Sequence, residues 1–461
     1  MKPFKHQNPI KYHDSAEDSG LLFSKQQLIH LLWPLVVEQL LSVLVGMVDV
    51  LMVAYVGEAT VSGVSLVDSV NMLVIQVLFA LTAGGTVVCA QFIGGGNYKS
   101  ASKSGGQLLF ITTSVMFCIS AAFLVKGDSL LAVVFGQVES NVMTDAVKYL
   151  AYTAASFPFL AVYYSAAAIF RAEGSTKLAM LVSLGMNVLN IIGNAICIFG
   201  LHMGVEGVAL PTLIARMAAA LFMVFCLQHY GQRIRISSLS QLQPDFGIIR
   251  KILAIGIPNS VESSLFNFGK ILLQSLVSTL GTASIAAYAV ASNLATYLYL
   301  PGNALGAGMI TVVGQCYGAN KPEQARYYAR QLLYLNYAFL TVICSVLIVG
   351  RSFWVGCYNL SPLSASLAEG LILAHAVAMV IWPVAFLLPY YFRAVGKAAF
   401  TMKVAVFAMA VFRVGLAYLF VALLHKNVLW VWYAMFVDWV FRIIVFGYYF
   451  LKKDTQDNSL R

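Results

Sequence analysis

Apolar runs of about 20 residues or more recur along the whole chain, and this feature constrains its fold most strongly. A run of that length crosses a membrane as a helix, whereas a barrel strand needs only about ten residues of alternating polarity. Charged residues make up only 10% of the 461 residues, and hydrophobic residues make up 60%. So little polar surface cannot cover a soluble core. The sequence therefore predicts an all-α integral membrane protein.

The apolar segments divide the chain into twelve predicted transmembrane helices. They cover residues 28–53, 61–93, 106–125, 147–169, 178–200, 207–228, 252–280, 284–316, 331–350, 367–391, 402–424 and 428–450. A long basic connection separates the sixth helix from the seventh. We therefore predict an N-terminal segment, an N-terminal lobe, a linker, a C-terminal lobe and a C-terminal tail, at 1–27, 28–228, 229–251, 252–450 and 451–461.

The basic residues predict the orientation of these helices. With an even number of spans, both termini lie on one side, and most of the 29 Lys and Arg residues fall on that side. By the positive-inside rule we expect both termini to be cytoplasmic. The net charge of +10 then reflects this bias, and we expect no nucleic-acid partner. The seven cysteines have no metal-binding spacing, which favours small apolar packing residues.

The two halves of the chain repeat each other. A shift of 224 residues pairs, without a gap, Pro34 with Pro258, Glu38 with Glu262, Gln91 with Gln315 and Gly94 with Gly318. Further on, FRAEG at 170–174 matches FRAVG at 392–396. Six spans in each half give both halves one orientation and a pseudo-twofold axis along the membrane normal. Such a repeat is typical of alternating-access transporters with a cavity between or within the halves.

Several polar side chains of the N-terminal half are predicted to reach a similar depth within the membrane. Asp49 interrupts the apolar stretch GMVDVLMV, and its repeat position is Leu273, so this acid belongs to one half only. Since intramembrane charges are costly, we predict a functional acid there. The other members of this level are Asp68, Asn187, Asn190, Asn194 and Thr212, and for the asparagines hydrogen bonding between helices is the alternative.

Other charges in the spans favour structural roles. Glu38 and Glu262 recur in both halves, which favours hydrogen bonding to the helix backbone broken near Pro34 and Pro258. A place in a substrate cavity is the alternative for both, and it is shared by Asn187 and by Lys270. Elsewhere, Asp438 and Arg442 are spaced to pair on one helix, and His375 is expected to make a buried polar contact. Lys270 and Arg413 could face a cavity of the second half or neutralise Glu262 or Asp438.

Five segments together resemble the multidrug and toxic compound extrusion (MATE) family of bacterial cation-coupled efflux antiporters. They are VDVLMVAYVG, VVCAQFIGGGNYKSA, FRAEGSTK, NVLNIIGNAICIFG and PNSVESSLFNFGK. The resemblance extends over about residues 28–450. It implies two six-helix lobes that export amphipathic, often cationic organic compounds in exchange for H⁺ or Na⁺.

The resemblance also implies roles for single residues. Asp49 corresponds to the ion-coupling aspartate of the first helix, and Pro34 to the proline at which that helix bends. Asn190, Asn194 and Thr212 correspond to its polar neighbours, although Asn194 stands where the family carries an aspartate. Asp68 is a further ion-coupling candidate. Asp49, Asn190 and Asn194 offer the oxygen atoms for Na⁺ as the alternative to H⁺, and no cofactor or other metal is expected.

We therefore expect a secondary transporter, and no enzyme, in the bacterial cell membrane. Its partners would be small-molecule drugs or organic cations and membrane lipid, and it would act as a monomer. The alternative is a lipid-linked oligosaccharide flippase of the same wider superfamily, which would need a strongly basic cavity. The enzyme motifs HExxH and GxSxG do not occur in the sequence.

Overall fold

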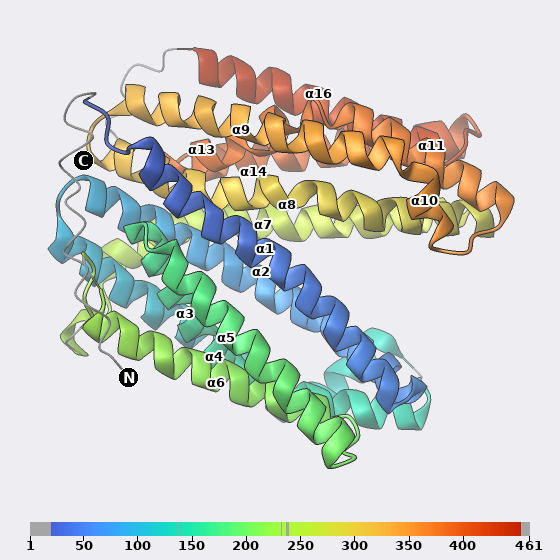
Figure 1. Ribbon diagram of the computed structural model, residues 1–461, viewed down its shortest axis with the longest axis horizontal. Helices are drawn as coiled ribbons and strands as arrows, with labels where there is room; N and C mark the ends of the chain where they lie inside the picture. The colour runs from blue at the N-terminus through green and yellow to red at the C-terminus, as the bar shows by residue number, and fades with distance from the viewer. Residues whose placement is uncertain (1–19, 137, 232, 237–238, 453–461) are drawn as a thin grey trace. The chain divides into compact units, whose positions relative to one another are not determined.

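The computed structural model describes residues 20–136, 138–231, 233–236 and 239–452. Throughout these residues the regular structure is helical, and no strand occurs among them (Figure 1). Most of the predicted N-terminal segment and almost the whole predicted C-terminal tail lie outside the described residues.

Six long helices make up the first half of the chain and coincide with the first six predicted spans. They are α1 (Lys25–Val56), α2 (Glu58–Gly94), α3 (Tyr98–Phe135), α4 (Ser140–Glu173), α5 (Thr176–Ala195) with the π-helical turn η1 (Ile196–Gly200), and α6 (Glu206–His229). A short 3₁₀ turn, η2 (Leu239–Leu242), leads to α7 (Phe246–Ser278) and α8 (Thr282–Gly318), which contain the seventh and eighth predicted spans.

The rest of the chain is helical but more often interrupted. It comprises α9 (Pro322–Val349), α10 (Arg351–Gly356), α11 (Pro362–Ala378), α12 (Trp382–Phe386), α13 (Leu388–Ala394), α14 (Ala398–Ala408), η3 (Met409–Gly415), α15 (Leu416–Tyr418), η4 (Leu419–Leu423) and α16 (Leu429–Leu451). The elements from α14 to η4 form one span, in which η3 and η4 are π-helical.

Length and apolarity confirm the membrane class. Within the described residues, nine helical segments are long and apolar enough to cross a membrane, and a bent pair of helices makes a tenth if it is one span. The tenth predicted span is broken, because α11 meets the segment Trp382–Ala394 at 74°. Pro383 and Pro389 lie in the first turns of α12 and α13, where the missing N–H group of proline starts a new helix more readily than it continues one.

Two compact units make up the chain. The first contains Met1–Ile257 and Ile310–Gln324, and the second contains Pro258–Met309 and Ala325–Arg461. In the first unit, α4 packs against α2, α3 and α6, and α5 packs between α1 and α6 (Figure 1). The beginning of α7 and the end of α8 belong to the first unit, whereas the lobe boundaries predicted from the sequence follow the connections of the chain and stay a prediction.

The ends of α2 and α8 cross at backbone contact within the first unit. A Cβ atom on Gly94 would overlap the carbonyl group of Gln315, and a Cβ atom on Gly318 would overlap that of Gln91. The repeat pairs these same residues, Gln91 with Gln315 and Gly94 with Gly318, so each half contributes the same glutamine and glycine. Only glycine permits so close an approach of two helix backbones.

Asp245 connects the linker to the first unit. Its side chain accepts hydrogen bonds from the backbone N–H groups of Gly247 and Ile248 at the start of α7, and it pairs with Lys103 on α3. The hydrogen bond from Lys103 and that from Ile248 hold the pKa of the Asp245 carboxyl below its ordinary value. The ionised carboxylate therefore caps α7 and ties its first turn to α3.

Replacement of Gly318 by alanine tests the helix crossing. The added methyl group meets backbone atoms that cannot rotate away, so we expect Gly318→Ala to lower stability by roughly 1–3 kcal/mol. The measurement is thermal unfolding of the purified protein in detergent. The control is Gly447→Ala on α16, where a Cβ atom meets nothing within 4 Å. Equal unfolding temperatures for Gly318→Ala and wild type would contradict the crossing.

Candidate functional site

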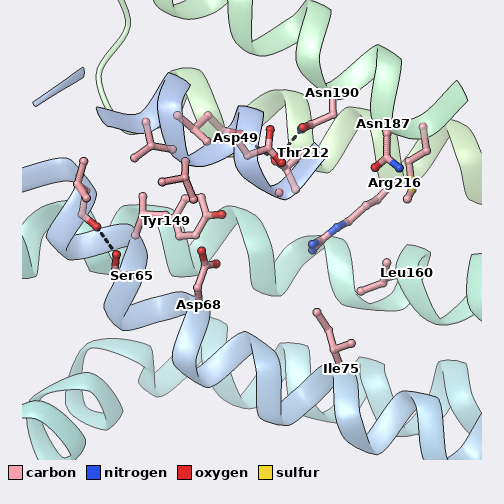
Figure 2. Close-up of a pocket in the computed structure, with 18 of the residues that line it drawn as sticks. Asp49, Ser65, Asp68, Ile75, Tyr149, Leu160, Asn187, Asn190, Thr212 and Arg216 are labelled. Atoms are coloured by element: carbon pink, nitrogen blue, oxygen red, sulfur yellow. Dashed lines mark hydrogen bonds between the residues drawn. The ribbon is translucent and has the colours of Figure 1, made fainter. Parts of the chain in front are cut away.

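Five helices of the first unit, α1, α2, α4, α5 and α6, surround a cavity of about 440 Å³ (Figure 2). Its polar lining comes from Asp49, Ser65, Asp68, Tyr149, Tyr164, Asn187, Asn190, Thr212 and Arg216. The structure thus brings together the polar residues that the sequence placed at one depth on four spans. Asn194 is fully buried one helical turn beyond Asn190 and contacts Asp49.

An amide group contacts the Asp49 carboxylate, and a further amide and a hydroxyl group lie next to it. Asn194 Nδ2 donates to Asp49 Oδ1 at 3.3 Å, and Asn190 Nδ2 donates to Thr212 Oγ1 at 2.9 Å. Thr212 Oγ1 in turn donates to the carbonyl oxygen of Val208 at 2.9 Å. Among the described residues, no Lys or Arg forms an ion pair with Asp49. Its carboxylate is therefore contacted by an amide dipole and not by a cation, although Arg216 lines the same cavity, and this suits a site that takes up H⁺ or another small cation.

The Asn190 amide has two orientations that fit the same atom positions. In the first, its nitrogen faces Thr212 and its oxygen faces Asp49 Oδ1; in the second, its nitrogen donates to Asp49 Oδ1 at 3.2 Å and its oxygen accepts from Thr212 Oγ1 at 2.9 Å. Two oxygen atoms face each other favourably only with a proton or cation between them. The orientation with the nitrogen on Asp49 is therefore the one that suits an ionised carboxylate.

Thr176 compensates for the backbone break at Pro34. Proline has no N–H group, so the carbonyl oxygen of His30 loses its partner within α1. Thr176 Oγ1, at the start of α5, donates to Leu31 O at 2.8 Å and lies 3.4 Å from His30 O. Helix α1 is continuous through Pro34 in this structure, and a bend there stays a prediction.

Glu38 and Glu262 form equivalent ion pairs in the two halves. Arg171 Nη2 donates to Glu38 Oε1, and Arg393 Nη2 donates to Glu262 Oε1 at 2.7 Å. Both arginines belong to the repeated FRAxG motif. The prediction that these acids bond to backbone beside the prolines is therefore wrong, because the arginine side chains meet them. Neither acid lines the cavity around Asp49.

The remaining charged candidates lie in the second unit. Asp438 pairs with Arg442 at 2.7 Å and with Arg413 at 3.0 Å, and both predicted partners are confirmed. His375 makes the expected buried contact, because its Nε2 lies 2.9 Å from the Tyr299 hydroxyl. The Lys270 ammonium lies over the Phe266 ring, and a place in a substrate cavity stays a prediction for Lys270.

Sequence reasoning left several polar cavity residues without a role, among them Arg216 and Tyr149. Arg216 is one helical turn beyond Thr212 on α6, and this i, i+4 spacing within a span was a signal that could have identified it. Tyr149 on α4 faces Asp68 across the cavity (Figure 2). No pattern distinguished it from the other 22 tyrosines of this aromatic-rich chain, since the sequence has 23 in all.

The MatE family model matches the chain twice, over residues 34–196 and 258–419. The matches begin at Pro34 and Pro258, the two prolines that the internal repeat pairs. Each half of the chain is therefore one copy of the unit that this family model describes.

Curated relatives cover most of the chain. The uncharacterized transporter YisQ of Bacillus subtilis is 25% identical over 428 residues, which are 91% of this chain and 92% of the relative. The probable multidrug resistance protein NorM of Thermotoga maritima is 26% identical and covers 69% of each chain. The multidrug export protein MepA of Staphylococcus aureus is 22% identical, over 80% of this chain and 81% of its own.

Solved structures share the fold. A MOP superfamily transporter from Pyrococcus furiosus, described as having a binding pocket of reverse polarity, superimposes with a TM-score of 0.84 at 21% identity. It covers 92% of this chain and 94% of its own. A multidrug resistance MATE family transporter in an outward-facing conformation gives the same TM-score, identity and coverage. The all-helical, two-lobe MATE fold predicted from the sequence is therefore confirmed.

Removal of one partner tests the repeated ion pair. The side chains of Glu38 and Arg171 are 12% and 18% exposed, so Glu38→Gln leaves a mostly buried guanidinium without its counter-charge. We expect a loss of roughly 2–4 kcal/mol in stability. Thermal unfolding in detergent measures this loss. The double variant Glu38→Gln/Arg171→Gln should recover part of it, and strictly additive losses would show that the two side chains are not coupled.

Proposed function

The chain belongs to the MatE family of membrane transporters, and on this premise we propose that it is a secondary active multidrug efflux antiporter. It exports amphipathic organic compounds in exchange for H⁺ or Na⁺ by alternating access. The relatives named for multidrug resistance and multidrug export support this assignment.

The observation that carries the proposal is the environment of Asp49. This carboxylate lines a cavity, contacts an amide group and has no basic ion-pair partner among the described residues. An acid that served only to hold helices together would be expected to have a basic partner, as Glu38 has. Asp49 is instead accessible to an ion and to a substrate at the same time.

The exchange proceeds through the occupancy of Asp49. When the site is open to the outside, Asp49 takes up H⁺ or Na⁺, and the charge that held the amino group of a substrate is neutralised. The substrate, no longer held at this carboxylate, then leaves. When the site is open to the cytoplasm, the ion dissociates and a new substrate binds to the ionised carboxylate.

One charge per cycle is sufficient for modest pumping. A membrane potential of 100 mV supplies about 2.3 kcal/mol for each charge that moves across. This free energy corresponds to a substrate gradient of somewhat under 100-fold.

The cavity composition favours efflux over the flippase alternative. A site for a lipid-linked pyrophosphate would need several cationic side chains, whereas this cavity is lined by two acids and one arginine. We further propose that the protein resides in the bacterial cell membrane with both termini in the cytoplasm. It acts there as a monomer in contact with lipid, and it needs no cofactor besides the coupling ion.

Replacement of Asp49 by asparagine tests the proposed coupling. The amide keeps the size of the side chain but can neither bind nor release a proton, so we expect at least tenfold slower ethidium efflux from proteoliposomes with an imposed gradient. H⁺ and Na⁺ gradients are imposed separately, and the one that drives wild-type efflux identifies the coupling ion.

The control is Glu206→Gln, which removes an exposed acid from the start of α6. Glu206 pairs loosely with Lys148 at 3.5 Å, and its side chain is 42% exposed, so transport should stay at the wild-type rate. Undiminished efflux by Asp49→Asn at equal protein levels would refute the role of this acid.

A further inference from the structure

Arg216 places a fixed positive charge in the same cavity as the two acids. It extends from α6 into the space lined by Asp49 and Asp68 (Figure 2). Across the part of the chain that the structure describes, the guanidinium forms no ion pair with a carboxylate. Arg216 therefore does not serve to neutralise either acid by direct contact.

A buried hydroxyl group holds the guanidinium in place. Arg216 Nη1 donates to Ser156 Oγ at 2.7 Å, and Ser156 Oγ donates to the carbonyl oxygen of Thr153 at 2.6 Å. Ser156 is fully buried in α4. Because guanidinium has five N–H donors in a planar fork, this one bond orients the group and leaves several donors for a ligand.

The distribution of charge in the cavity defines what it can bind. A purely cationic compound would be attracted by Asp49 and Asp68 but repelled by Arg216 within the same 440 Å³. A molecule with an amino group near the acids and a carboxylate at the arginine satisfies all three. Planar, bidentate hydrogen bonding to a carboxylate is the interaction for which arginine is best suited.

We propose that Arg216 binds the carboxylate of the exported compound, so that the cavity selects small amphipathic molecules that carry both an amino group and a carboxylate. This inference rests on the proposed antiport function and specifies its substrate class. It is compatible with ion exchange, because neutralisation of Asp49 removes the partner of the amino group and leaves the substrate held at one end.

The test uses two fluorescent dyes that differ in one group. A rhodamine with a free benzoate carries a carboxylate, and its methyl ester does not. Equilibrium binding to the purified protein in detergent is measured by fluorescence anisotropy. We expect wild type to bind the acid more tightly than the ester, and Arg216→Gln to weaken binding of the acid about tenfold, as expected for the loss of a charge-assisted hydrogen bond. The same variant should bind the ester more tightly, since a repulsive charge is gone.

Two further variants sharpen the result. Arg216→Lys keeps the positive charge but loses the planar set of N–H donors. Its affinity for the carboxylate dye should therefore lie between those of wild type and Arg216→Gln. Lys148→Gln removes a basic side chain outside the cavity lining that is 51% exposed, and it should not change the preference for the acid.

The proposal is overturned if wild type binds the ester at least as tightly as the acid, or if Arg216→Gln weakens both dyes equally. Ion-driven transport of the ester by wild type separates this outcome from a failure of the proposed function. If the ester is exported but the acid binds no more tightly than the ester, the proposed antiport is supported and the proposed role of Arg216 is refuted. If neither dye is transported under any gradient, antiport itself is in question.

Discussion

An uncompensated charge in the hydrocarbon layer costs several kcal/mol, and the chain meets this cost in two different ways. Glu38, Glu262 and Asp438 each pair with at least one arginine. Asp49 has no such partner among the described residues and contacts an amide group at the edge of a cavity. Acids in ion pairs with arginine hold helices together, whereas an acid that contacts an amide group without an ion pair keeps its capacity to bind an ion. This distinction separates the acids that stabilise the helix packing from the acid of the candidate site.

The internal repeat independently distinguishes structural residues from those of the candidate site. What recurs is structural: the Glu–Arg pairs, and the glycines at which α2 and α8 cross. What does not recur belongs to the candidate site. Leu273 occupies the repeat position of Asp49. The duplicated scaffold thus carries this acid of the candidate site in one half only, as is expected where one copy has specialised after duplication.

Local patterns in the sequence were enough to predict the spans, the repeat and the shared depth of Asp49, Asn190 and Thr212. Helix period and span length determine the spans and the shared depth, because they depend on neighbours a few residues apart. The repeat needs only a comparison of the two halves of the sequence. The partners of Glu38 and Glu262 were not predictable in this way, since Arg171 lies 133 residues from Glu38. The opening of Arg216 into the cavity likewise depends on Ser156, 60 residues away on another helix.

The FRAEGSTK motif contacts α1 on both sides of Pro34, where the family resemblance predicts a bend. Arg171 holds Glu38, four residues after Pro34, and Thr176 holds the carbonyl oxygen of Leu31, three residues before it. This one short segment therefore contacts α1 on both sides of Pro34. The second half keeps the arginine, as Arg393, but has no hydroxyl at the position of Thr176. A bend at Pro34 would therefore act on a helix that is held at one point before the proline and at one point after it, and Asp49 lies further along that same helix.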